Sequence, residues 1–187
     1  MRASRDLTRQ LVALGHARIG FVGGLANVST AADRVRGYRL ALRGAHRPAD
    51  PELLRSGAFK ADGAWSAARD LLKLEDRPTA IVAGNDLMAL GVLQAAGDLG
   101  LRVPGDLAVV GFDDIEIAAH REIQLTTMAQ QKAEMGRLAV FGILEILRDP
   151  VRFGGQPLQQ VLAPTLIVRR TCGALPGSRG RQGGARG

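Results

Sequence analysis

The chain has 187 residues, of which 46% are hydrophobic and 4% aromatic, so it can form one domain or two small lobes around a core of aliphatic side chains. The single cysteine, Cys172, excludes an internal disulfide framework and a cysteine-rich metal site. The sequence has no uncharged apolar run of about 18 residues and no secretory signal at its start, so we expect a cytoplasmic protein without a membrane span.

The formal net charge of +7 is unevenly distributed along the chain. Five arginines and no acidic residue follow residue 168, and subtracting these five from +7 leaves +2 for the rest. The body is therefore not strongly basic, and the charge does not argue for nucleic-acid binding. Residues 174–187 are rich in glycine and arginine, so we expect a disordered tail.

Helical and strand-like segments alternate along the first two thirds of the sequence. This alternation predicts an α/β fold in which helices flank a parallel sheet. The second helix begins near Thr30, which is spaced with Asp33 as a variant capping box. The expected strands are residues 18–24, 53–59, 79–83 and 107–114, and the expected helices are residues 4–15, 29–43, 62–74 and 87–99.

The pattern changes after residue 114. Residues 125–130 form a β-rich connector, and residues 131–147 form a long apolar helix. Two short segments, residues 158–162 and 165–170, suit strands and are separated by Pro164.

Polar and aromatic side chains follow the predicted strands where each strand ends. Because the carboxyl ends of parallel strands meet at one edge of a sheet, we expect Arg34, Phe59, Asn85 and Asp113 to converge there. A cation, a ring, an amide and a carboxylate suit a small polar ligand.

Three of these residues also have a simpler interpretation. Asn85 or Asp86 can serve only as a helix N-cap, Arg34 can be solvated, and Phe59 can belong to the core. The set contains no nucleophile paired with a base, so we expect no enzyme activity and no cofactor. A weaker alternative is an enzyme with a divalent cation between Asn85-Asp86 and Asp113-Asp114, but no phosphate-binding loop or lysine accompanies them. The histidines lack metal-ligand spacing, so we expect no metal site.

Short motifs in a fixed order cover roughly residues 7–172. They include Arg18-Ile19-Gly20-Phe21-Val22-Gly23-Gly24, Arg34-x-x-Gly37-Tyr38, Asn85-Asp86-x-Met88-Ala89-Leu90-Gly91, Val109-Val110-Gly111-Phe112-Asp113-Asp114 and Leu125-Thr126-Thr127. This ordered set resembles the effector-binding domain of the LacI/GalR family of bacterial transcriptional regulators. One departure is Gln130-Gln131, which replaces the family's usual Gln-Pro.

The resemblance implies a type I periplasmic-binding-protein-like fold of two α/β lobes with a ligand cleft between them. It implies a second lobe that is essentially complete and a first lobe that is mostly missing. The resulting assignment is residues 1–17 to a helix of the truncated first lobe, 18–128 to the second lobe, 129–148 to a helix returning to the first lobe, 149–173 to C-terminal strands of the second lobe, and 174–187 to the tail.

The resemblance also implies roles for individual residues. Arg34, Asn85 and Asp113 match the family's polar ligand contacts, and Phe59 matches an aromatic that packs on the ligand. Gln130 matches a residue at the crossover between lobes, and Thr30 is a weaker match.

The implied partner is a small-molecule effector, often a sugar or a purine in this family. Operator DNA would be bound only through a helix-turn-helix that is absent from this chain. The long apolar helix would expose apolar surface, so we expect a homo-oligomer. The alternative is a sugar-binding module of a solute-binding protein with no DNA role.

Overall fold

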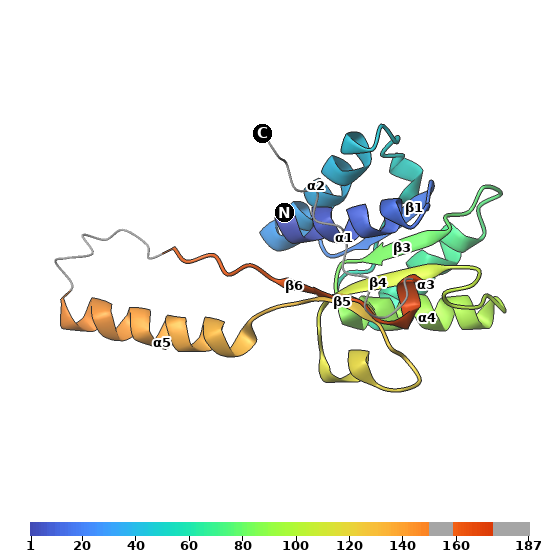
Figure 1. Ribbon diagram of the computed structural model, residues 1–187. Coiled ribbons are helices and arrows are strands. Elements are labelled where there is room, and N and C mark those ends of the chain that lie inside the picture. Colours follow the sequence, from blue (N-terminus) through green and yellow to red (C-terminus); the bar gives the residue numbers. More distant parts are fainter. Residues whose placement is uncertain (150–158, 174–187) are drawn as a thin grey trace, which may run out of the picture.

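Six strands form one sheet in the order β2-β1-β3-β4-β5-β6 in the computed structural model, which describes residues 1–149 and 159–173 (Figure 1). The first five strands run parallel, and β6 is antiparallel to β5. The predicted parallel sheet with flanking helices is thereby confirmed. The strand bounds are β1 Ile19–Gly23, β2 Leu54–Ser56, β3 Ala80–Ala83, β4 Ala108–Asp113, β5 Thr126–Ala129 and β6 Thr165–Ile167.

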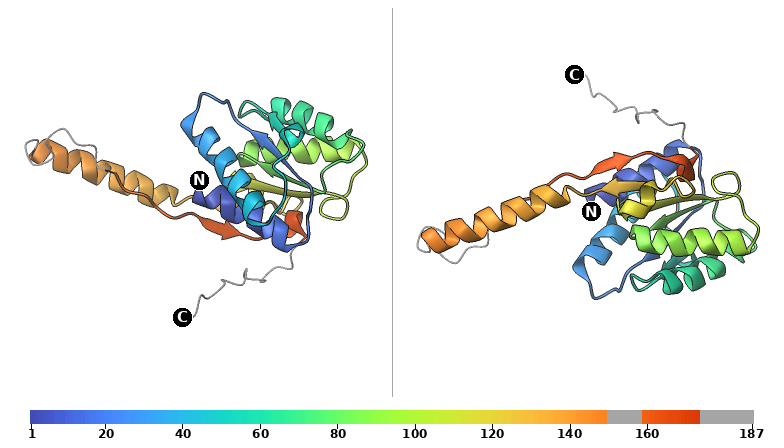
Figure 2. Two further views of the ribbon diagram at one scale, coloured as in Figure 1. Left: turned by 90° about the horizontal axis from the view of Figure 1, so that it is seen from above. Right: turned by 90° about the horizontal axis from the view of Figure 1, so that it is seen from below.

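Helices cover both faces of this sheet. Helices α1 and α2 pack on one face, and α3 and α4 pack on the other, as the two views in Figure 2 show. The helix bounds are α1 Arg2–Ala13, α2 Ser29–Gly44, α3 Ala61–Leu72, α4 Asp86–Asp98 and α5 Lys132–Arg148, with short 3-10 turns η1 Pro51–Leu53, η2 Glu116–Ala119 and η3 Arg170–Cys172.

The central strands are buried on both faces, as expected for parallel strands between two helical layers. Successive side chains alternate between the layers. Phe21 and Val82 face α1 and α2, whereas Val22 and Ile81 face α3 and α4. Each fully buried aliphatic side chain of this kind contributes roughly 1.5–3 kcal/mol to folding.

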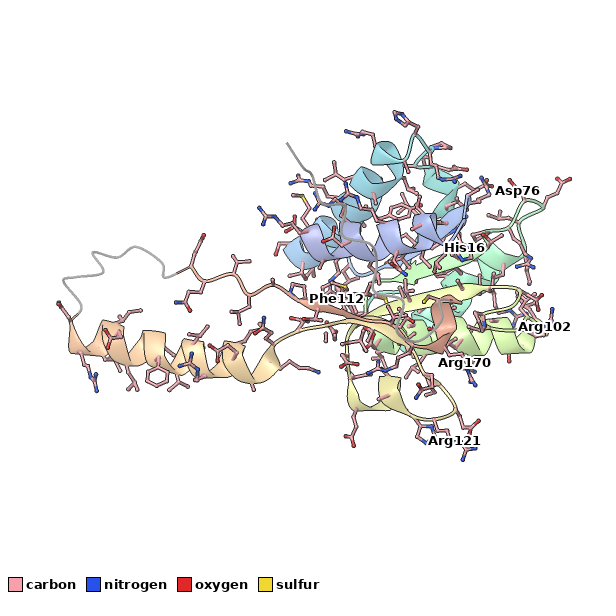
Figure 3. The ribbon with its side chains drawn as sticks, viewed as in Figure 1. His16, Asp76, Arg102, Phe112, Arg121 and Arg170 are labelled. Atoms are coloured by element: carbon pink, nitrogen blue, oxygen red, sulfur yellow. The ribbon has the colours of Figure 1, made fainter. Side chains whose placement is uncertain are left out.

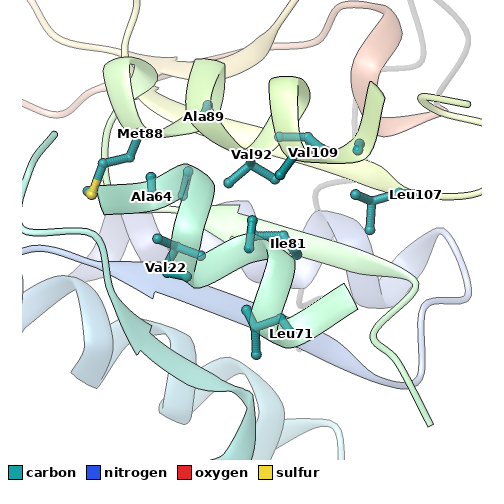
Figure 4. Packing of buried hydrophobic residues seen from close by; sticks show 14 of the residues in the cluster. Val22, Ala64, Leu71, Ile81, Met88, Ala89, Val92, Leu107 and Val109 are labelled. Atoms are coloured by element: carbon teal, nitrogen blue, oxygen red, sulfur yellow. The ribbon is translucent and has the colours of Figure 1, made fainter. Parts of the chain in front are cut away.

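Small residues let α3 and α4 approach each other closely. Ala64 packs near Met88, Ala89 and Val92 in the core between these helices and the sheet (Figure 4). A Cβ at Gly91 would lie 2.1 Å from the Ala61 carbonyl oxygen, so only glycine fits at this contact.

Helix α1, which the resemblance assigns to the truncated first lobe, packs on the sheet described above. Helix α1 buries Leu7 and Leu11 completely on the same sheet face as α2. Ser4 Oγ donates a hydrogen bond to the Arg34 carbonyl oxygen over 2.7 Å, and a Cβ at Gly37 would lie 2.3 Å from the Met1 carbonyl oxygen. The apolar side of this amphipathic helix packs on β-strands that follow it in the same chain.

Three local expectations also change. Helix α2 starts at Ser29 with Val28 at the N-cap and no side-chain cap, so Thr30 forms no capping box. Strand β2 stops at Ser56, before Phe59. Residues 159–162 form no strand, while residues 150–158 and the predicted tail, residues 174–187, lie outside the described residues.

Helix α5 projects away from the sheet and has no buried residue (Figures 1 and 2). Phe141 and Ile143 are 54% and 59% exposed and, being two positions apart, point to nearly opposite sides of the helix. A helix with apolar side chains on several sides is ordinarily buried. Among the described residues, no helix is long and apolar enough to cross a membrane.

Candidate functional site

Arg34 sits in the second turn of α2, where the helix begins above the carboxyl end of the sheet. Its Nη1 donates a hydrogen bond to the Gly84 carbonyl oxygen, and its Nη2 lies 3.4 Å from Asp113 Oδ1. The guanidinium carbon lies 4.0 Å from the centre of the Phe112 ring, within cation–π range. Burial lowers the pKa of Arg34, and the carboxylates of Asp113 and Asp86 oppose that shift.

Asp113 is the last residue of β4 and accepts hydrogen bonds from two elements. One donor is Arg34. The other is Gln130, the residue directly after β5, whose Nε2 donates a hydrogen bond to Asp113 Oδ1 over 2.5 Å. The φ angle of Asp113 is 115° and that of Asp114 is 51°. Non-glycine residues in such conformations store strain, and strain of this kind clusters at ligand sites.

A groove of about 860 Å³ opens beside these side chains, and we call it the rim groove. Its walls come from the start of α1, the start of α2, the ends of β4 and β5, and a segment that precedes β6. Figure 3 shows Phe112 at the end of the sheet from which β5 leads to α5. The residues lining the rim groove include Arg2, Asp6, Thr30, Asp33, Arg34, Phe112, Gln130, Gln131, Met135 and 161–164.

The structure brings four of the six predicted site residues together. Thr30, Arg34 and Gln130 line the rim groove, and Asp113 contacts both Arg34 and Gln130. A carboxylate, a guanidinium, an amide and a hydroxyl can bind several hydroxyl groups of one small ligand.

The other two predicted residues do not line this groove. Asn85 Oδ1 accepts a hydrogen bond from the Met88 backbone N–H over 2.8 Å and caps α4, which is the simpler interpretation of this residue. Phe59 has a φ of 61°, and its ring packs on Gly24 so closely that a Cβ there would lie 2.0 Å from it. Asn85 still adjoins Gly84, the backbone partner of Arg34.

Sequence reasoning missed the central role of Asp86. This side chain is 1% exposed; it accepts hydrogen bonds from Thr127 Oγ1 over 2.5 Å and from the Ile115 backbone N–H over 2.9 Å. Burial raises the pKa of Asp86, although both hydrogen bonds oppose the rise. Asp86 thereby ties α4 to β5 and to the loop that follows Asp113.

Phe112 was also missed, although it follows the buried run of β4 and lies under the Arg34 guanidinium. Gly111, the residue before Phe112, lies against the buried Asp86: a Cβ at this position would lie 2.2 Å from Asp86 Oδ1. That distance marks Gly111 as the space that the buried carboxylate occupies.

The three acids and one amide of the possible cation site, at positions 85, 86, 113 and 114, each bind a different partner in the protein. Asp114 Oδ1 accepts a hydrogen bond from Arg169 Nη2 over 2.7 Å, and Arg169 Nη1 donates to the Leu125 carbonyl oxygen over 2.8 Å. Within residues 1–149 and 159–173, no cluster of three or more His, Cys, Asp or Glu side chains has the arrangement of a metal site.

Comparison with known proteins matches residues 8–172 to the periplasmic binding protein-like domain family. The ribose operon repressor of Haemophilus influenzae is 35% identical over 168 residues, which are 90% of this chain and 50% of the repressor. The transcriptional repressor PurR of Aliivibrio salmonicida is 36% identical over 142 residues, which are 76% of this chain and 43% of PurR. The chain thus spans about half the length of these curated relatives.

Solved structures agree with the sequence matches. The complex of the transcriptional regulator CelR with cellobiose superimposes with a TM-score of 0.81 and 34% identity, over 90% of this chain and 51% of CelR. Family match, sequence relatives and fold therefore point the same way, and this chain belongs to the periplasmic binding protein-like domain family, as found in transcriptional regulators of the LacI type.

Proposed function

We propose that this chain is the small-molecule sensing domain of a LacI-type transcriptional regulator, with a sugar or related metabolite as its effector. The main support is the arrangement of Arg34, Asp113 and Gln130 around the rim groove. Arg34 and Gln130 both donate to Asp113 Oδ1, so the three polar groups are held close to one another. Preorganised polar groups of this kind lower the cost of ordering on binding.

The chemistry of the groove suits a polyol. The Asp113 carboxylate can accept hydrogen bonds from two adjacent hydroxyl groups, and the Arg34 guanidinium can donate to ring or hydroxyl oxygens. The names of two similar proteins, a ribose operon repressor and a regulator in complex with cellobiose, favour the same ligand class.

We propose that operator DNA is bound by a helix-turn-helix that is not among these 187 residues. PurR is named as a helix-turn-helix type repressor, and this chain matches 43% of its length. Helices α1 to α4 all pack on the sheet, so none of them is available as a DNA-recognition helix. The residues lining the rim groove include no nucleophile paired with a base. We therefore propose a sensing role in the cytoplasm and no catalytic one.

Helix α5 supports a proposal about assembly. Its exposed apolar side chains would be covered either by a first lobe, as the family resemblance implies, or by another copy of the chain. For the chain as it stands we propose a homo-oligomer formed through α5, because seven of its large apolar side chains are 39% to 70% exposed.

The experiment that tests the sensing function is a thermal-shift screen with a panel of sugars and nucleosides. A ligand at a hundred times its Kd should raise Tm by roughly 5–10 °C for a chain of this size. Asp113→Ala should remove the shift. Trp65→Phe in α3, which does not line the rim groove, should keep it. Loss of the shift in both variants would mean that the ligand binds elsewhere.

A second candidate is a sugar-binding module of a solute-binding protein with no DNA role, which the family description favours. The two differ in their genetic context. A helix-turn-helix encoded in frame next to this segment supports the regulator, whereas a transporter gene beside it supports the solute-binding module.

A further inference from the structure

A second groove, of about 750 Å³, lies on the other side of α2 from the rim groove. The two grooves share no lining residue, so this inference is independent of the proposed effector site. We call it the arginine groove. Its lining includes Phe21, Val35, Leu40 and Leu54 as an apolar floor and Arg36, Arg39, Arg43 and Arg55 as its charged groups.

The position of the arginine groove follows from how the helices cover the sheet. On this face α1 contacts β3 and β5, and α2 contacts β1. The edge strand β2 has no covering helix on this face, whereas α3 covers it on the other. The groove is therefore the place that a third helix, lying beside α2, would occupy.

The four arginines of the groove have no acidic partner in the described part of the chain. Arg36, Arg39 and Arg43 are exposed, and their spacing puts them on one stripe of α2. Asp33, three residues before Arg36, lies 4.0 Å from the N-terminal amine, and Asp50 and Glu52 pair with Arg18 over 3.1 and 3.5 Å. Arg55 Nη1 donates to the Glu52 and Leu54 carbonyl oxygens, which leaves its charge uncompensated. Four cations without acidic partners around an apolar floor repel one another and favour an anionic partner.

We propose that the arginine groove binds an acidic amphipathic helix of a partner protein. Apolar side chains of that helix would cover Val35, Leu40 and Leu54, and its carboxylates would pair with the arginines around them. Guanidinium groups favour bidentate pairing with carboxylates. The lined part of α2, residues 31–43, is about 18 Å long, which matches a partner helix of three to four turns.

The floor of the groove favours a peptide over a nucleic acid. Single-stranded nucleic acids bind through aromatic side chains on which bases stack, but Phe21 is only 1% exposed and the remaining floor is aliphatic. The C-terminal residues of this chain do not suit the groove either, because no acidic residue follows residue 168.

Fluorescence anisotropy with the full chain tests this proposal. The probe is a synthetic helical peptide in which glutamate and leucine recur at helical spacing. Arg39→Glu with Arg43→Glu should weaken its binding at least tenfold, because two attractions become repulsions. The matched control is Arg121→Glu with Arg170→Glu, which changes the net charge equally, and both residues lie far from α2 (Figure 3). The control should change binding less than about threefold, as expected for distant screened charges.

Two further probes complete the test. The same peptide with glutamine in place of glutamate should lose binding, and a single-stranded oligonucleotide should bind more weakly than the acidic peptide. Equal losses in both charge-reversal pairs, no saturable binding of the acidic peptide, or tighter binding of the oligonucleotide would each overturn the proposal. If Arg39→Glu with Arg43→Glu does not fold by circular dichroism, Arg39→Gln with Arg43→Gln replaces it, and the expected loss is then about threefold.

Discussion

The Arg34 guanidinium and the Asp113 carboxylate join helix α2 to the end of strand β4, with 3.4 Å between Nη2 and Oδ1. The two side chains are 15% and 27% exposed, so water screens this pair only in part. The same carboxylate also accepts the Gln130 amide. One acid therefore holds three neighbouring parts of the rim groove in place.

Asp113→Asn should lower the free energy of unfolding by about 1–2 kcal/mol, because it leaves the partly buried Arg34 without its counter-charge. Asparagine tolerates a positive φ about as well as aspartate does, so the substitution should not change the backbone strain at this position. Urea denaturation measures the change. Arg34→Gln and the double variant complete a double-mutant cycle, and strictly additive effects would show that the pair contributes nothing.

Asp86 should make the stability of the protein depend on pH. Burial raises its pKa in the folded state above the ordinary value of an aspartate, so the folded state holds this proton at a pH where the unfolded chain has released it. Stability from this residue is therefore lost as the pH rises from about 4 through the folded pKa. Asp86→Asn removes this titration and keeps a similar shape.

The measurement is a series of urea titrations from acidic to neutral pH. The unfolding free energy of the unmodified protein minus that of Asp86→Asn should fall as the pH rises. A difference that stays constant or increases with pH would mean that Asp86 ionises as easily in the folded protein as in the unfolded chain.

Gly111→Ala should destabilise the protein by about 1–3 kcal/mol, as overpacking of a full core does. The added Cβ would lie 2.2 Å from Asp86 Oδ1 and 2.9 Å from Leu125 Cδ2. The control is Gly136→Ala in α5, where a Cβ meets nothing within 4 Å. That change should be neutral or stabilise the helix by about 0.5–1 kcal/mol. Thermal unfolding followed by circular dichroism compares the two variants, and similar Tm values would contradict the tight packing at Gly111.

The exposed apolar side chains of α5 should drive self-association at micromolar concentration. Phe141→Glu with Leu147→Glu should shift the particle mass toward that of a monomer, because a charge at the centre of an apolar contact is costly. Leu87→Glu is the control, since Leu87 is 45% exposed but lies on α4. Light scattering after size-exclusion chromatography gives the mass. A monomeric unmodified chain would end this proposal.

Much of the sheet could be read from local patterns. Buried parallel strands appear as short apolar runs, and residues 79–83 and 107–114 were predicted close to the observed β3 and β4. The rule that carboxyl ends of parallel strands share one edge was sufficient to bring Asp113 near Arg34. Residue spacing decides these features, since each depends on neighbours along the chain.

Other features depend on contacts between distant segments, which local spacing does not encode. The amphipathic pattern of α1 specifies an apolar side but not the sheet that will cover it, and the helix packs on its own α/β body. The position of strand ends at one edge of the sheet does not specify where a side chain points. Asn85 caps α4, and the Phe59 ring packs on Gly24. Asp86 can be buried because Thr127, 41 residues away, and the Ile115 backbone N–H donate hydrogen bonds to it. Contacts across the sheet decide such features, because a buried polar group is stable only where distant segments supply its hydrogen-bond partners.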